Sequence, residues 1–415
     1  MKISKIALAA AVTLVTAQAQ AGTVYLAGAS ATQANYRAAL VSLCSGTATT
    51  IISTADTNKS AVKCSVDFDG LPGVDAVAIS VNGGSFTAVT TSVGTGTETF
   101  VDVSDTSGAT LTAPRQSEGG FLDIDAASFP QSEYDAFGVT SVPATEPASF
   151  SQVFGVAVSP ALYTALQTAQ GLTAAGCGID SVTPACQPNI TKAQYSTIAG
   201  SAFNKVKGST LVETGDAAGS GAGFLLGSSF DGEELVLCRR VSTSGTQASS
   251  NQYFLNYYVG GDGAVGGRVD PADQTTYGGG LAVTGIPFDV QEGSGTGNTR
   301  GCLSGDGYRL GVLSLENAPD LTTRSQGQRA DRKWRYVKIN GVHAYEPAVN
   351  STATAKAGTY DFWFVSQKFG ATPNGQAVVN AIDAALGSGL SVPGLFSNAS
   401  SDAKRDSNVA PIRFD

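Results

Sequence analysis

A short stretch, residues 239–246, combines donors that could bind a small anion: Arg-Arg-Val-Ser-Thr-Ser-Gly-Thr. It follows an apolar strand, and the aromatic-rich segment after it is expected to form a helix beginning near Thr246. The first N–H groups of a helix have no partner within it and lie at the positive end of its dipole, so they would face an anion in the turn. Gly245 lets the anion approach the backbone, Ser244 and Thr246 add hydroxyl donors, and Arg240 can donate to two oxygen atoms at once. The alternative interpretation is a helix cap beside a surface arginine.

A second strand, loop and helix unit begins just after residue 21. Residues 23–26 are strand-like, and the small residues 28–32 form a turn. After the turn, Tyr36, Leu40 and Leu43 lie at helical spacing, on one apolar stripe. This loop is therefore also expected to end at a helix N-terminus.

Strands alternate with helices along most of the chain, which predicts an α/β protein with mainly parallel sheets. Apolar strands are expected at 153–158, 310–315 and 360–365, and a helix at 376–386. Another helix begins at a capping box that opens with Thr191. A chain of 415 residues exceeds one ordinary hydrophobic core, so two lobes are expected.

The segment from residue 45 to residue 114 is rich in Thr, Ser, Gly and Val and is interpreted as strands and loops. Gly83-Gly84-Ser85 is expected to form a sharp turn. Residues 90–112 resemble a polar hairpin or an insertion. The sequence assigns no role to this segment.

Residues 1–21 are expected to be a signal peptide. Lys2 and Lys5 precede an apolar run, and Ala19-Gln20-Ala21 fits cleavage after Ala21. No later segment approaches the roughly 20 apolar residues that span a bilayer, so we expect a periplasmic or secreted protein with no membrane insertion. Loss of the two lysines changes the formal net charge from −9 to about −11, which argues against nucleic acid as a partner.

Six cysteines in an exported chain predict up to three disulfides. Pairing neighbours along the sequence favours the following bonds: Cys44 with Cys64, Cys177 with Cys186, and Cys238 with Cys302. A metal site is the rival interpretation, but the spacings match no zinc pattern and His343 is the only histidine. We therefore expect neither a metal nor a cofactor.

Several segments resemble, in order, the phosphate-binding proteins of bacterial ABC transporters, a branch of the type 2 periplasmic binding proteins. Residues 28–32 look like that family's first phosphate loop, and Asp123, within Gly-Gly-Phe-Leu-Asp, resembles its ligand carboxylate. Residues 239–246 have the spacing of its Arg-x-Asp-x-Ser-Gly-Thr signature. Residues 154–158 look like its crossing strand, residues 190–200 like one of its helices, and residues 308–314 like a late strand. The matches are short, but together they cover most of the chain.

The resemblance implies a two-lobed type 2 periplasmic binding protein fold. Each lobe would hold a mainly parallel sheet flanked by helices, and two crossing strands would form the hinge. Lobe 1 would be discontinuous, residues 22–153 plus 356–415, and lobe 2 would be residues 154–355. The protein would be a monomer that closes on inorganic phosphate or a related oxyanion and serves an ABC-transporter permease.

Carried over residue by residue, the resemblance also implies a ligand site between the lobes. Asp123 would accept the proton of a protonated oxyanion, which favours hydrogen phosphate over sulfate, and Asp125 is a rival for this role. Arg240 would donate charge-assisted hydrogen bonds. The complete ligand set would be Thr32, Ser85, Asp123, Arg240, Ser244, Gly245 and Thr246.

Departures from the family pattern bear on this site. Ser242 stands where the family has an aspartate that holds the arginine, so Arg240 is expected to be freer or oriented by another group. Gln33 replaces an aromatic residue after Thr32. Another glycine-rich stretch, residues 293–298, is interpreted as a flexible loop because it lacks the strand, lysine and helix of a nucleotide-binding loop.

Three functions stay open. The first is an exported binding protein that captures phosphate for uptake. The second keeps the fold but gives it a scavenging, adhesion or assembly role at the cell surface, with weak or no anion binding. The third, a phosphoester hydrolase like the relatives labelled alkaline phosphatases, is disfavoured because hydrolysis needs metal ligands or a nucleophile beside a base. We therefore expect no enzyme.

Overall fold

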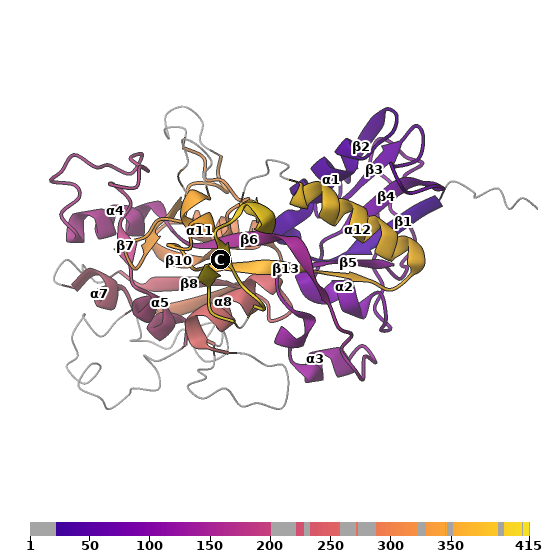
Figure 1. Cartoon of the computed structure of the whole chain (residues 1–415). Helices are drawn as coiled ribbons and strands as arrows, with labels where there is room; N and C mark the ends of the chain where they lie inside the picture. Colours follow the sequence, from indigo (N-terminus) through magenta and orange to yellow (C-terminus); the bar gives the residue numbers. More distant parts are fainter. Residues whose placement is uncertain are drawn as a thin grey trace, which may run out of the picture.

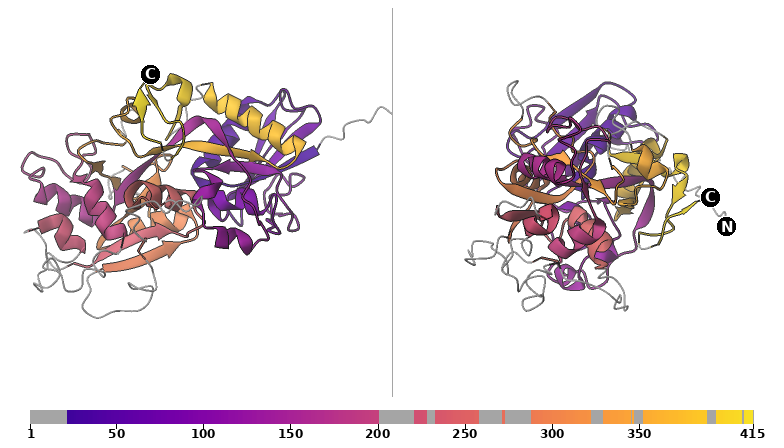
Figure 2. Two further views of the ribbon diagram at one scale, coloured as in Figure 1. Left: turned by 60° about the horizontal axis from the view of Figure 1, so that its bottom comes forward. Right: turned by 90° about the vertical axis from the view of Figure 1, so that its left-hand side faces the viewer.

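The computed structural model describes residues 22–200, 221–227, 233–257, 271–272, 288–321, 329–344, 346, 352–388, 394–408 and 410–414. The expected signal peptide lies outside these ranges. Two groups of elements, here called lobe 1 and lobe 2, lie side by side (Figure 1 and the left view of Figure 2). Strands β6 (Glu146–Val158) and β13 (Trp363–Gly370) run between them. The chain therefore has the expected two-lobed α/β architecture.

Lobe 1 is built on a four-stranded sheet of order β1-β4-β3-β2. Its strands are β1 (Gly22–Ala27), β2 (Ala48–Ile52), β3 (Lys59–Cys64) and β4 (Val74–Ser80). Helices α1 (Gln33–Ser42) and α12 (Pro373–Gly387) share one apolar core with β1, β3 and β4. Its shorter elements are η1 (Ser30–Thr32), η2 (Gly84–Phe86), α2 (Thr87–Thr90), η3 (Ala126–Ser128) and α3 (Gln131–Asp135), where η marks a 3-10 helix.

Lobe 2 lies at one end of a larger sheet of order β5-β13-β6-β10-β8-β9. The strands not yet given are β5 (Gly119–Leu122), β8 (Leu235–Arg240), β9 (Phe288–Gly293) and β10 (Tyr308–Ser314). The helices are α4 (Pro160–Ala169), α5 (Lys192–Ala199), α7 (Gly221–Leu226), α8 (Gly245–Leu255), α10 (Thr296–Leu303) and α11 (Ala353–Lys356). Short strands complete the chain: β7 (Asn189–Ile190), β11 (Arg335–Tyr336), β12 (Lys338–Ile339), β14 (Leu395–Ser397), β15 (Ala403–Lys404) and β16 (Arg413–Phe414), with η7 (Asn398–Ser400).

The helix starts follow from the residues that cap them. Thr191 accepts a hydrogen bond from the backbone of Gln194, whose side chain accepts one from the backbone of Thr191, so the expected capping box is confirmed. Thr372 caps α12 and is followed by proline at the first helical position, where a missing N–H costs nothing. Ser159 caps α4 in the same way.

Strand β6 passes through both lobes because its two halves pair with different partners. Residues 146–153 pair with β13, and residues 154–158 pair antiparallel with β10. The second half is buried on both faces and reads as a continuous apolar run, Phe-Gly-Val-Ala-Val. Any change in the angle between the lobes must therefore bend β6 and β13.

Strand pairing is more mixed than the sequence suggested. Parallel pairs occur between β1 and β4, β8 and β9, and β8 and β10. The pairs that involve β2, β3, β5 and β13 are antiparallel. One reason lies in the segment 45–114, which adds β2 and β3 as an antiparallel hairpin to the edge of lobe 1.

The three expected disulfides are confirmed: Cys44–Cys64, Cys177–Cys186 and Cys238–Cys302. Among the described residues, no helix is both long enough and apolar enough to cross a bilayer. Within the same residues, no group of three or more His, Cys, Asp and Glu side chains is placed to hold a metal ion.

Candidate functional site

The predicted site residues follow the carboxyl ends of strands from both lobes. Thr32 follows β1 and Ser85 follows β4, while Asp123 comes directly after β5. Arg240 ends β8, and Ser244 is the N-cap residue of α8. All these side chains, and that of Thr246, are at most 4% exposed. Six polar side chains from separate segments are thus buried where a soluble protein usually buries apolar ones.

The Ser-Gly-Thr corner of lobe 2 is in contact with the loops of lobe 1. Thr246 Oγ1 lies 3.4 Å from Asp123 Oδ2, and the backbone N–H of Asp123 donates to Ser85 Oγ at 2.9 Å. A Cβ atom on Gly245 would lie 2.0 Å from Ser85 Oγ and 2.7 Å from Asp123 Oδ2. Only glycine therefore fits at this corner while the loops stay in place.

This contact gives a first prediction. Gly245→Ala should lower the free energy of unfolding by about 1–3 kcal/mol, because the added methyl group must push Ser85 or Asp123 aside. Thermal unfolding would measure this loss. Gly178→Ala is the matched control, since its Cβ would meet nothing within 4 Å. Equal behaviour of the two variants would contradict this account of the corner.

The guanidinium of Arg240 is held by three oxygen atoms. Nη1 donates to Thr296 Oγ1 at 2.9 Å and to Ser30 Oγ at 3.3 Å, and Nη2 donates to the Ser294 carbonyl at 3.1 Å. Its backbone N–H donates to Gln247 Oε1 at 3.0 Å. Ser30 belongs to lobe 1 and the other partners to lobe 2, so Arg240 lies where the lobes meet.

Several buried polar atoms around Arg240 and Asp123 have no hydrogen-bond partner. They are Nε of Arg240, Oδ1 of Asp123, Oγ of Ser244 and Oγ1 of Thr32, the last of which has the hydroxyl of Tyr36 as its neighbour. An unpaired buried polar group costs about 1–3 kcal/mol, so such groups are rare in folded proteins. Three of these groups can donate hydrogen bonds and one is a carboxylate oxygen. Together they could bind an anion that carries both free oxygen atoms and a proton.

Burial also perturbs the two charged groups. Loss of solvent raises the pKa of Asp123 to about 6, although the positive charge of Arg240 opposes this shift. The same effect lowers the pKa of Arg240 to about 10, which leaves the guanidinium charged at neutral pH. Asp123 therefore titrates within reach of physiological pH, whereas Arg240 does not.

Two other acidic or phenolic groups feel the charge of Asp123. Burial raises the pKa of Tyr36 and of Glu316 well above their usual ranges, and Asp123 raises both further. Glu316 follows β10, a strand of lobe 2 next to β6. The site thus lies in a region where negative charge is disfavoured unless it is paired.

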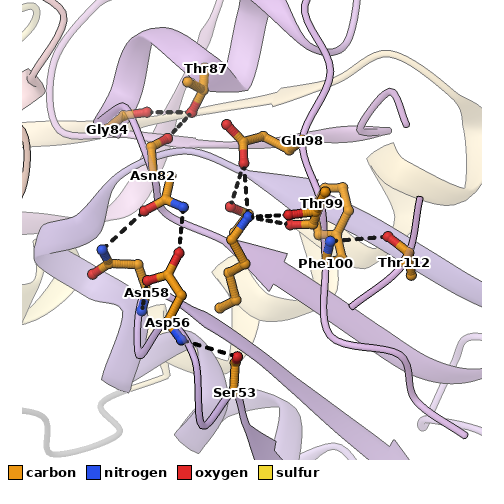
Figure 3. Close-up of polar contacts among 12 residues, drawn as sticks. Ser53, Asp56, Asn58, Asn82, Gly84, Thr87, Glu98, Thr99, Phe100 and Thr112 are labelled. Carbon is orange, nitrogen blue, oxygen red and sulfur yellow. Dashed lines mark hydrogen bonds and ion pairs between the residues drawn. The ribbon is translucent and has the colours of Figure 1, made fainter. Parts of the chain in front are cut away.

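The loop that carries Ser85 is fixed by a polar network in lobe 1 (Figure 3). Asn82 donates to Asp56 at 2.7 Å and accepts from Asn58 at 3.0 Å. Thr87 Oγ1 lies within hydrogen-bond distance of the carbonyl oxygens of Asn82 and Gly84. Gly84 has a φ of 72°, which confirms the expected sharp turn.

Buried Lys59 supports the same side of lobe 1. Its ammonium group donates to the carbonyl and hydroxyl oxygens of Thr99 and lies 3.3 Å from Glu98. Residues 98–115 fold back as a loose hairpin, with antiparallel bridges such as Val101–Leu111. Residues 56–59 and 98–99, elsewhere in the segment 45–114, therefore support the loop that carries Ser85.

The structure separates some residues that the sequence placed together. The carboxylate of Asp125 interacts with Asn408 and not with Arg240, so Asp123 is the acidic group of this cluster. Ser242 donates to Glu133 at 3.2 Å and makes no contact with Arg240. As expected, another group orients the arginine, and that group is the Ser30, Ser294 and Thr296 set.

Sequence reasoning missed this set, and the interpretation of residues 293–298 as a flexible loop was wrong. The stretch follows strand β9 and opens helix α10. The side chain of Asn298 accepts a hydrogen bond from the N–H of Gly295 at 3.0 Å, which fixes the turn. A Ser-Gly-Thr pattern occurs here as well as at 244–246, and this repetition was the available signal.

The chain was compared with known proteins. No protein-family model and no curated protein matches the sequence. One similar solved structure is a substrate-binding protein assigned to phosphate ABC transport from Clostridium perfringens, with bound phosphate. The two chains are 11% identical, the match covers 87% of this chain and 93% of that chain, and the TM-score is 0.38. PstS from Borrelia burgdorferi is 10% identical over 87% and 91% of the two chains, with a TM-score of 0.33. A phosphate binding protein from Stenotrophomonas maltophilia is 14% identical over 82% and 69%, with a TM-score of 0.37. These similarities are too low to show what this chain binds.

Proposed function

We propose that this chain is an exported binding protein that captures a tetrahedral oxyanion, phosphate first among them, between its two lobes. The observation that carries the proposal is the set of buried unpartnered atoms on Thr32, Asp123, Arg240 and Ser244. An oxyanion would satisfy the donors with its free oxygen atoms. The carboxylate of Asp123 would accept the proton that hydrogen phosphate carries and sulfate lacks.

The wider role follows from this site. Lobe 1 would comprise residues 22–153 plus 356–415 and lobe 2 residues 154–355, with β6 and β13 bending as the lobes open and close. Three disulfides suit a protein that works in an oxidising compartment, such as the periplasm or the cell exterior. A monomer that delivers its ligand to an ABC-transporter permease fits these features, and no catalytic step is needed.

Calorimetric titration of the protein without residues 1–21 against phosphate, arsenate, molybdate and sulfate tests the proposal. Phosphate should bind in the micromolar range or more tightly, arsenate should bind similarly because it also keeps a proton, and sulfate should bind least. No heat with any of the four anions would favour the second function, in which a protein of this fold acts in adhesion, assembly or scavenging without anion capture.

The pH dependence of sulfate binding gives a further prediction. With a pKa of about 6, Asp123 is mostly ionised at pH 7.5 and mostly protonated at pH 5. The ionised form repels sulfate, whereas the protonated form donates a hydrogen bond to it. Sulfate should therefore bind about 30-fold more tightly at pH 5 than at pH 7.5, following the protonated fraction of one carboxyl group. A sulfate affinity that is flat over this pH range would show that Asp123 does not contact the anion.

A further inference from the structure

In the described part of the chain no acidic side chain forms an ion pair with Arg240, although the charge of Asp123 acts on it. None of the ion pairs found there, to a limit of 4.0 Å, involves its guanidinium. Three neutral oxygen atoms bind it instead, from Ser30, Ser294 and Thr296. We call these three the neutral clamp. Unlike a carboxylate, they orient the arginine without cancelling its charge.

The clamp leaves a defined set of donors for a ligand. Nη1 donates to two oxygen atoms of the clamp and Nη2 donates to the third, so the clamp leaves the Nε–H donor unused. Nε and Nη2 lie on the same side of the planar group. Nε of Arg240 is buried and unpartnered. This edge is the fork that binds two oxygen atoms of one oxyanion.

Thr296 is the central member of the clamp. Its hydroxyl oxygen lies 2.9 Å from Nη1 of Arg240 and 3.1 Å from Oγ of Ser30. Both hydroxyl oxygens accept from the guanidinium, and one hydroxyl can donate to the other, so the three groups form a closed triangle across the two lobes. Removal of the Thr296 hydroxyl breaks two sides of this triangle.

The backbone holds the clamp in register with Arg240. Strands β8 and β9 pair in parallel, with Arg240 opposite Gly293, and the N–H of Val241 donates to the Gly293 carbonyl at 3.2 Å. A disulfide joins Cys238 of β8 to Cys302 of α10. The arginine and the helix that begins with Thr296 are therefore fixed to each other at two points.

We propose that Thr296, with the Ser294 carbonyl, is the positioning residue of Arg240, so that the arginine presents its Nε–Nη2 edge to a doubly charged oxyanion. This inference rests on the proposed function only for the identity of the ligand. The positioning itself can be measured without any ligand, so the two can fail separately.

The binding test compares three single variants. Thr296→Val removes the hydroxyl but keeps the shape, and it should weaken phosphate binding roughly tenfold or more, as the loss of a hydrogen bond to a charged group does. Thr296→Ser restores the hydroxyl and should bind within about threefold of the parent chain. Thr168→Val, the same substitution at an exposed position of α4, should bind like the parent chain.

A double-mutant cycle with Arg240→Ala separates positioning from general damage. If Thr296 acts through Arg240, Thr296→Val should change the affinity by less than about twofold once the arginine is absent. An undiminished effect of Thr296→Val in the Arg240→Ala chain would overturn the proposal.

The ligand-free measurement is the NMR signal of the Arg240 side chain, assigned by its loss in Arg240→Lys. Rotation of the Nη groups should be slow in the parent chain, in Thr296→Ser and in Thr168→Val, and fast in Thr296→Val. If rotation is slow in the parent chain but phosphate does not bind, the clamp is supported and the proposed function is rejected. Fast rotation in the parent chain would reject the clamp, whatever the protein binds.

Discussion

Arg240→Ala should weaken phosphate binding by about 2–5 kcal/mol, which is roughly 30-fold to a few thousand-fold in Kd. Arg240 is 2% exposed, and three oxygen atoms hold its guanidinium in one orientation. Its removal takes away the only fork of donors that the described site offers and leaves the carboxylate of Asp123 without a positive neighbour. Calorimetric titration at pH 7.5 and low salt would measure the loss.

Arg239→Ala is the matched control for this variant. The two arginines are adjacent and carry the same charge, but Arg239 faces Glu292, at 3.6 Å, and the carbonyl of Ala272. Arg239→Ala should change the thermal unfolding temperature more than it changes the affinity for phosphate. If both variants weakened binding equally, the effect would come from the general field of the protein and not from contact with the ligand.

Asp123→Asn should change which anion is preferred. The substitution keeps the shape but replaces an acceptor-only carboxylate with an amide that also donates. Phosphate should lose the hydrogen bond from its proton, and sulfate should gain a donor, so the phosphate-to-sulfate preference should fall by roughly 10- to 150-fold. Paired titrations with the two anions at pH 7.5 would show this change.

The same variant has a predictable effect on stability. The pKa of Asp123 is raised in the folded state, so the folded protein holds its proton at a pH where the unfolded chain has lost it. Stability without ligand should therefore decrease as the pH rises from about 4 to about 6, by up to about 3 kcal/mol. Asp123→Asn should remove the contribution of Asp123 to this decrease. Asp125→Asn removes only the contribution of its own raised pKa, so it should retain the Asp123 contribution and the anion preference. A parent chain whose stability rises over this interval would contradict the buried, unpaired state of Asp123.

Much of the framework could be predicted because it depends on local chemistry. The capping box at Thr191, the apolar strands and the turn at residues 83–85 are each determined by residues next to one another in the chain. The disulfide pairs followed from proximity along the sequence, and Cys238–Cys302 followed by elimination. The structure also brings Asp123, Ser85 and the Ser-Gly-Thr corner into contact, although their role as ligands remains a prediction.

The clamp could not be predicted because it depends on strand order. Residues 293–298 follow Arg240 by more than fifty positions, and only the pairing of β9 with β8 brings them together. The mixed sheets have the same origin, since the direction of β6 relative to β10 depends on how the chain crosses between the lobes. The repeated Ser-Gly-Thr pattern marks the second loop, but it does not say which strand that loop lies beside.

The bond between Cys238 and Cys302 has a consequence for the timing of binding. On the proposed route of export, the chain first passes through a reducing compartment, where this crosslink does not persist and α10 is tied to β8 less firmly. We expect the newly made chain to have little affinity for phosphate until oxidation joins the two segments. The proposed capture of phosphate would then begin only outside the cytoplasm, and phosphate inside the cell would stay unbound.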